Sequence, residues 1–139
     1  MLNWSALAGH HHTKLRSAIF ITFPGNCKQA LTFYQACFGG QLQFDFFKKK
    51  LPGFTEMPVI NGSLFSDSII IHGSDLVHDE GRKLGNYLSV FLHCKNRFER
   101  KLLVEKLACG TKNYLSQHSD DHQLIELTDA FDVRWVLGV

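Results

Sequence analysis

The spacing of apolar positions divides the first half of the chain into a strand, a helix and further strands. The segment LRSAIFITF, Leu15 to Phe23, is rich in β-branched and aromatic residues and precedes Pro24-Gly25, which predicts a strand and a turn. Apolar residues then recur at helical spacing, which predicts a helix with Asn26 as its N-cap and Gly39-Gly40 as its end. Strands are predicted next at 41–47, 63–65 and 68–72, with a loop over 48–62.

The second half repeats this order. A strand is predicted over 87–94, and Asn96 is the expected N-cap of a helix that ends at Gly110, which places the two helix units 70 positions apart. Asp67 and Gly73 match Asp132 and Gly138 at an offset of 65. Further strands are predicted at 112–116, 123–128 and 133–137. The chain is therefore expected to be a duplication of one βαβββ unit.

The second helix is expected to bury one apolar stripe and to expose its charged residues. Phe98, Leu102, Leu103 and Leu107 form that stripe, and Arg100 lies among the residues predicted to face solvent.

Length and composition indicate one globular domain. The chain has 139 residues, of which 45% are hydrophobic and 20% are charged, close to the average of globular proteins. We expect a flexible N-terminal tail over 1–14 and a single domain over 15–139, with modules at about 15–76 and 85–139. The three histidines at 10–12 are assigned to the tail rather than to a metal site.

Charge and cysteine content exclude several classes of function. The net charge of +2 is small and the lysines at 48–50 are typical of a solvated loop, so no nucleic-acid partner is expected. The N-terminal segment has neither a charged start nor an apolar run long enough for a signal or a membrane span, which favours a cytoplasmic protein with no membrane partner. Cys27 and Cys37, ten positions apart on one helix, are too distant for a disulfide.

Three segments of the sequence resemble a known family. FPGNCKQALTFYQACFGG, IIIHGSD and LTDAFDVRWVLG are similar to the PhnB-like branch of the vicinal-oxygen-chelate superfamily, which includes glyoxalases, bleomycin-resistance proteins and extradiol dioxygenases. The resemblance covers residues 15 to 138. It implies an α+β fold in which two βαβββ modules curl into half-barrels around a cavity, and it implies a homodimer. The edge-like segments at 63–65 and 137–139, which carry no lysine or proline, agree with a dimer.

The resemblance also implies where a metal would be held. Enzymes of the superfamily use His, Glu or Gln on the first strand and Glu on the last strand of each half. Matching the two helix N-caps puts Ile19 and Ser89 in the first-strand positions, and Val136 and Ile71 fall in the last-strand positions. Because none of these side chains binds metal, no metal cofactor is expected. A divalent metal remains the alternative, since a shift of one residue would replace Ile71 by His72.

The expected function is binding of a small molecule in the cavity, and the sequence leaves open whether a reaction follows. If Arg134 faces the cavity, it could hold an anionic ligand. The alternative is a metal-dependent lyase or dioxygenase with relocated ligands at His72, His93 or Glu126, and His72 with Glu126 forms a candidate acid/base pair. The predicted ligand-binding residues are Ile19, Ile21, Phe23, Ser89, Phe91, Arg134 and Val136.

Overall fold

The protein has an α+β fold, as predicted, with two small sheets that each carry one helix. The computed structural model describes residues 15–49, 51–54, 56–76, 82–111 and 123–139. The predicted N-terminal tail therefore lies outside the described residues. The chain forms two compact units, Met1–Arg82 and Lys83–Val139, and each is considered by itself.

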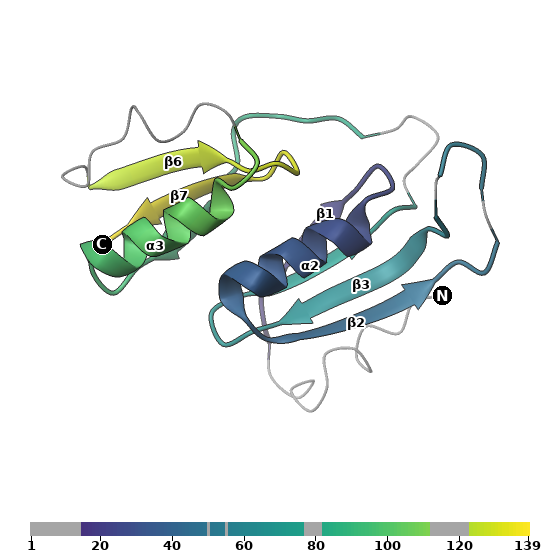
Figure 1. The fold of residues 1–139 in the computed structure, drawn as a ribbon, viewed down its shortest axis with the longest axis horizontal. Coiled ribbons are helices and arrows are strands. Elements are labelled where there is room, and N and C mark those ends of the chain that lie inside the picture. The colour runs from purple at the N-terminus through teal and green to yellow at the C-terminus, as the bar shows by residue number, and fades with distance from the viewer. Residues whose placement is uncertain (1–14, 50, 55, 77–81, 112–122) are drawn as a thin grey trace. The chain divides into compact units, whose positions relative to one another are not determined.

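The first unit contains the predicted order of one strand, one helix and three strands (Figure 1). Its sheet has the order β1-β4-β3-β2, with β1 parallel to β4 and the other pairs antiparallel. A long right-handed crossover through a helix is the usual way to join parallel strands. The elements are β1 (Ile19–Thr22), α2 (Cys27–Phe38), β2 (Gln41–Phe46), β3 (Val59–Phe65) and β4 (Ile70–Ser74).

The strand β3 begins earlier than predicted. The dipeptide Asn61-Gly62 is typical of a turn, but both residues lie inside β3. Gly62 is needed there for another reason, because an added Cβ would lie 2.9 Å from the side chain of Leu31 on α2. Close approach of helix and strand, rather than a turn, explains this glycine.

The helix α2 covers one face of the first sheet (Figure 1). A Cβ added at Gly73 would meet Phe23 at 2.7 Å and the thiol of Cys27 at 3.1 Å, so Gly73 lies directly beneath the start of the helix. Leu64 and Ile71 are fully buried on the same side. Alternation along each strand then defines a second face, turned away from α2, which we call the distal face.

The second unit has a three-stranded sheet of order β5-β7-β6 and one helix. The strand β5 is parallel to β7, and β6 is antiparallel to it. Trp135 and Leu137 are fully buried. The strand predicted over 112–116 lies outside the described residues. The elements are β5 (Val90–His93), α3 (Arg97–Leu107), β6 (Leu124–Thr128) and β7 (Arg134–Gly138).

The buried stripe of α3 differs from the predicted one. Arg100, Val104 and Leu107 are its buried residues, whereas Phe98 and Leu102 are exposed. The prediction that Arg100 faces solvent is wrong, since it is 1% exposed. Its guanidinium donates a hydrogen bond of 2.9 Å to the carbonyl of Gln123, and such a bond allows a long polar side chain to lie in a core.

The two helices are capped in different ways. Asn96 is confirmed as the N-cap of α3, because its Oδ1 accepts a 2.8 Å bond from the backbone N–H of Glu99. Asn26 is the N-cap residue of α2, as predicted, but its side chain does not make the expected capping bond. The carboxylate of Asp75 acts instead, from the end of β4, and accepts a 2.9 Å bond from the backbone N–H of Cys27.

Asp75 also connects three parts of the first unit. Besides Cys27, its Oδ1 accepts a bond of 3.1 Å from Gly25, and its Oδ2 accepts one of 3.0 Å from Val59. The side chain is 2% exposed. A single buried carboxylate therefore holds the turn before α2, the first turn of α2 and the beginning of β3.

Among the described residues, no helix combines the length and the apolar character that crossing a membrane requires.

Candidate functional site

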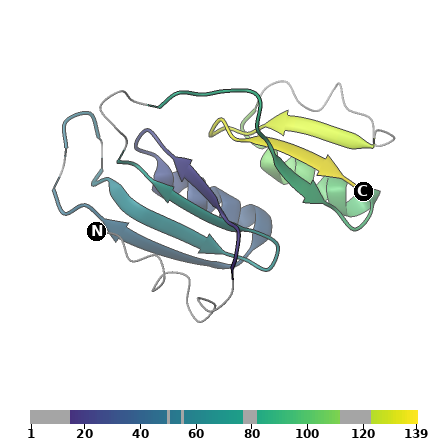
Figure 2. The ribbon, with the colours of Figure 1, turned by 180° about the vertical axis from the view of Figure 1, so that it is seen from behind.

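In Figure 2 the first sheet lies in front of α2, so this view looks onto the distal face. The paired residues of this face are mostly polar. Cross-strand partners share a face of a sheet. His72 is the Cα partner of Phe20 and of Ser63, and Ser63 is the partner of Gln43. The neighbouring row contains Thr22, Ser74, Asn61 and Asp45.

The centre of this face is a hydrogen-bonded pair of side chains. The hydroxyl oxygen of Ser63 lies 2.7 Å from Nδ1 of His72. Ser63 is fully buried and His72 is half-buried. The ring of Phe65 meets the imidazole edge to face, with centroids 5.8 Å apart. Burial removes water from the imidazole and lowers the pKa of His72 below its ordinary value of 6.5, so the neutral form of the ring predominates at pH 7.

A third buried polar residue lies beside this pair. Asn61 precedes Ser63 by two positions on β3 and thus projects to the same face. It is 3% exposed, and its Oδ1 has no hydrogen-bond partner among the described residues. We call Asn61, Ser63 and His72 the polar floor. Of these three residues, only His72 was a candidate from the sequence pattern, because Asn61 lay in the predicted loop 48–62 and Ser63 directly after it.

The lowered pKa of His72 gives stability a defined dependence on pH. His72 has its ordinary pKa of 6.5 in the unfolded chain and a lower pKa in the folded chain, so at pH values near and below 6.5 the unfolded chain binds more protons than the folded chain. The free energy of unfolding should therefore fall as the pH decreases from about 7.5 to about 5.5. In His72→Gln this part of the decrease should disappear. Urea denaturation at several pH values measures it.

The matched control for this measurement is His93→Gln, at an exposed position on β5. Its denaturation curves should keep the pH dependence of the parent protein. Equal slopes in the parent and in His72→Gln would show that His72 ionises alike in the folded and unfolded chains.

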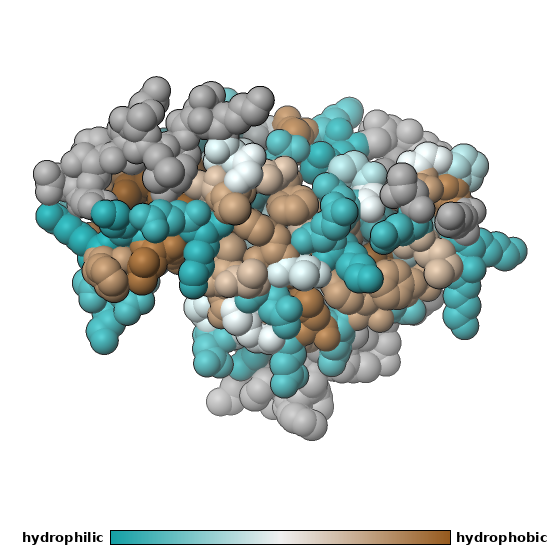
Figure 3. Space-filling model, in the orientation of Figure 1, coloured by the Kyte–Doolittle hydropathy of each residue, from teal (hydrophilic) through white to brown (hydrophobic). Residues whose placement is uncertain are grey.

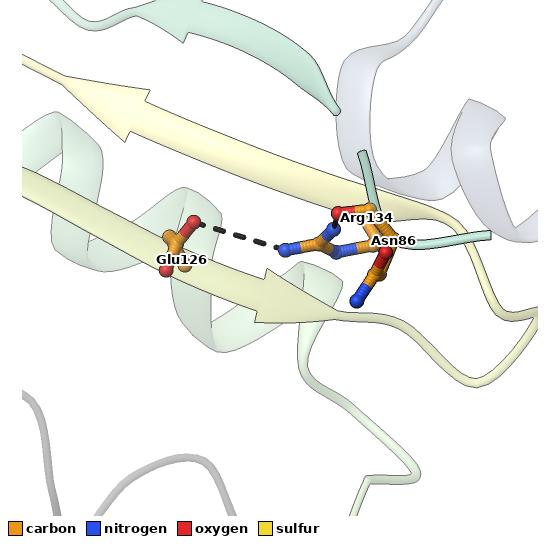
Figure 4. Close-up of polar contacts among 3 residues, drawn as sticks. All are labelled: Asn86, Glu126 and Arg134. Atoms are coloured by element: carbon orange, nitrogen blue, oxygen red, sulfur yellow. Dashed lines mark hydrogen bonds and ion pairs between the residues drawn. The ribbon is translucent and has the colours of Figure 1, made fainter. Parts of the chain in front are cut away.

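The second unit has a charged cluster on the face turned away from α3. Arg134 donates a hydrogen bond to the backbone carbonyl of Asn86, and its second guanidinium nitrogen lies 3.8 Å from Oε1 of Glu126 (Figure 4). The side chain of Glu126 is 68% exposed. An ion pair this exposed contributes less than about 1 kcal/mol, so an anionic ligand could replace Glu126 as the partner of Arg134.

The predicted ligand-binding residues fall on two kinds of surface. Phe91 and Val136 are Cα partners on the face turned away from α3, and Arg134 and Ser89 alternate onto that face. In the first unit, Ile19 pairs with buried Ile71 on the side of α2. Ile21 shares that side, and Phe23 is fully buried there. The ligand-binding role of all seven residues stays a prediction.

The sequence offsets that were used to match the two halves are each wrong by one residue, both for the first strands (70) and for the last strands (65). Ile19 is the Cα partner of Ile71 in the first unit, and Val90 is the Cα partner of Trp135 in the second. Ile19 therefore corresponds to Val90, an offset of 71, and Ile71 corresponds to Trp135, an offset of 64. The strands β4 and β7 also share the same burial pattern. The first strands are offset by one more residue than the helices because four residues, 23–26, connect β1 to α2, whereas three, 94–96, connect β5 to α3. The offset of the last strands follows from their parallel pairing with β1 and β5.

With this register, the residues at the expected metal positions do not fit a metal. Val136 corresponds to His72 at the offset of 64, and the Cα partners of these two residues on the first strands are Phe91 and Phe20. Ile19 and Ser89, which were expected at the first-strand positions, do not bind metal either. One imidazole is an incomplete donor set. Within the described part of the chain, no three His, Cys, Asp or Glu side chains come together as metal ligands would.

The two buried cysteines do not provide an activated nucleophile either. All four are free thiols, and Cys27 and Cys94 are buried. Burial, and next the charge of Asp75, raises the pKa of the Cys27 thiol. Burial likewise raises the pKa of Cys94, although Arg100 opposes this effect. Both groups are thiols rather than thiolates at neutral pH.

A groove of about 240 Å³ lies beside the beginning of α2. Helix beginnings often bind anions through free backbone N–H groups. Here, however, Asp75 already accepts the N–H groups of Gly25 and Cys27. The groove is lined by Pro24, Gly25, Asn26, Lys28, Gln29, Gly53, Phe54 and Glu56.

Comparison with known proteins supports the fold. No family profile matches the chain. Among curated proteins, protein YjdN of Escherichia coli strain K12 is 24% identical over 135 residues, which cover 86% of this chain and 92% of YjdN.

Two solved structures have closely similar folds. Protein PA1353 from Pseudomonas aeruginosa has a TM-score of 0.70 at 22% identity and covers 90% of this chain and 97% of its own. A PhnB protein from Bacillus cereus, described as a proposed 3-demethylubiquinone-9 3-methyltransferase, has a TM-score of 0.67 at 20% identity, with coverage of 89% and 98%. The chain thus has the PhnB-like fold that its three sequence segments indicated.

Proposed function

We propose that the protein binds a small molecule against the distal face of its first sheet and that it does so without a metal. The observation that supports this proposal is the polar floor. Ser63 and Asn61 are buried polar side chains in the middle of a sheet face, and His72 lies next to them. Ligand sites typically combine a few buried polar groups with aromatic walls, and Phe20 and Phe65 supply such walls on the same face.

Amide chemical shifts of isotopically labelled protein test the location of this site. Titration with phenol, toluene and sodium benzoate should move the backbone amide signals of Phe20, Ser63 and His72 for at least one of these probes. The signals of α3 provide an internal reference, because they belong to the other unit. If none of the three probes moves the signals of β1, β3 and β4, the proposed function is refuted.

The competing function is a metal-dependent lyase or dioxygenase that recruits His72, His93 or Glu126. It is favoured by the contact between Ser63 and His72, which orients the imidazole as contacts around a metal ligand do. The contribution of Glu126 rests on the prediction alone, since Glu126 belongs to the second unit and His72 to the first.

Metal titration followed by thermal denaturation separates the two functions. We expect Zn²⁺, Ni²⁺ and Mn²⁺ to leave the unfolding transition unchanged. A native-state metal site would add about 2.7 kcal/mol at one hundred times its dissociation constant, and His72→Ala would remove that gain.

The control replaces His10, His11 and His12 by alanine in the full chain. A stabilisation that this triple variant loses belongs to the N-terminal histidines. A stabilisation that the triple variant keeps and that His72→Ala loses would contradict the metal-free proposal.

We further propose that the protein is a homodimer. Apolar side chains reach the surface of both units (Figure 3), and Tyr87, Leu88 and Phe91 are more than half exposed in the second unit. A stable dimer would bury more than about 1,000 Å². Light scattering should give twice the mass of 15.8 kDa at micromolar concentration. A mass that stays at the monomer value as the concentration rises would refute the dimer.

A further inference from the structure

We infer that the ligand of the distal face is an uncharged aromatic molecule that donates a hydrogen bond, through a hydroxyl or an amide N–H, to Oδ1 of Asn61. This inference rests on the proposed binding function and names the chemical class of its ligand.

The acceptor is identified by comparison of the buried polar residues on this face. The hydroxyl of Ser63 is bonded to His72. The hydroxyl of Ser74 accepts a 3.1 Å bond from the backbone N–H of Leu76. By contrast, Asn61 Oδ1 has no partner among the described residues although it is removed from water. A buried acceptor without a donor is unfavourable, so a donor from a ligand would complete its hydrogen bonding.

The charge of the ligand follows from what surrounds this acceptor. Along the described strands, the residues of the two central rows include Asp45 but no lysine or arginine. The neutral form of the His72 imidazole predominates at pH 7, because burial lowers its pKa. A bound anion would therefore lose its hydration without gaining a positive partner, which is strongly unfavourable. An uncharged donor avoids this cost.

The shape of the ligand follows from the aromatic side chains. Phe20 is the Cα partner of His72, and its side chain is 54% exposed. The ring of Phe65 packs edge to face against the imidazole of His72. Aromatic rings prefer offset or edge-to-face neighbours, so a planar ring is the ligand body that the exposed Phe20 favours.

The probes phenol, toluene and benzoate separate the contributions of donor and charge. Phenol and toluene differ in one hydroxyl group, and benzoate adds a negative charge. Chemical-shift titration of the full chain should give a dissociation constant for phenol at least tenfold lower than that for toluene. Benzoate should bind more weakly than phenol.

Two asparagine variants test the assignment to Asn61. Asn61→Leu should retain toluene binding and reduce the difference between phenol and toluene to less than twofold. Asn26→Leu is the matched control, because Asn26 has a buried Oδ1 without a partner but lies in the connection before α2. It should keep the tenfold difference. If Asn61→Leu loses its dispersed amide spectrum, Asn61→Val takes its place.

The outcomes distinguish this inference from the proposed function. Equal binding of phenol and toluene in the parent protein, or tighter binding of benzoate, overturns the ligand class while the binding site stands. A tenfold difference that persists in Asn61→Leu overturns the role of Asn61. Only the loss of all binding at the distal face refutes the function itself.

Discussion

Replacing Asp75 by asparagine is expected to lower the free energy of unfolding by about 3 kcal/mol, because three backbone donors, two of them in buried hydrogen bonds, depend on its carboxylate. An asparagine oxygen can still accept from Gly25 and Cys27. Its amide nitrogen, however, would face the N–H of Val59, and two donors cannot satisfy each other. Urea denaturation followed by circular dichroism measures the change in unfolding free energy.

The control for this substitution is Asp67→Asn, in an exposed turn of the same unit. It should change the free energy of unfolding by less than about 0.5 kcal/mol. Amide exchange adds a local readout, since the N–H groups of Cys27 and Val59 should lose protection first in Asp75→Asn. Equal stability of the two variants would show that the three hydrogen bonds contribute nothing net.

Replacing Asn61 by leucine is expected to raise the free energy of unfolding of the ligand-free protein by about 1–2 kcal/mol, the opposite of the usual effect of a core substitution. Leucine is close to asparagine in size and shape, and it removes an acceptor that is buried without a partner. The unfolded chain loses the hydration of that amide, while the folded chain loses only an unfavourable burial.

Ser63→Ala is the contrasting variant on the same strand. It removes a hydroxyl that is bonded to His72, and it should lower the unfolding free energy by about 1 kcal/mol. If Asn61→Leu raises the unfolding free energy and Ser63→Ala lowers it, Asn61 is a residue that serves binding rather than stability. Residues of functional sites commonly have this property. A destabilised Asn61→Leu would instead mean that its amide is satisfied in solution.

Local patterns predicted the elements of this protein well. The helical spacing of Cys27, Ala30, Leu31 and Tyr34 correctly gave the buried face of α2, because an amphipathic period requires only local sequence. The duplicated order of strands and helix gave the α+β fold for the same reason.

Predictions failed where a distant residue takes over a local role. Asp75 supplies the capping oxygen of α2 from 48 positions away, so the side chain of Asn26, although it stands at the N-cap position, was the wrong choice for that bond. Arg100 is charged and belongs on a helix surface by composition, yet the carbonyl of Gln123 lets it lie in the core. No local pattern contains either partner.

The sequence by itself determined the two helices, most of the described strands and their order. Only the tertiary structure decided which face of each strand meets the helix. Side chains alternate with a period of two, and the observed strand pairing matches Val136 with His72 rather than with Ile71. Asn61 and Ser63 then join His72 through strand pairing, because register in a sheet depends on contacts between distant segments.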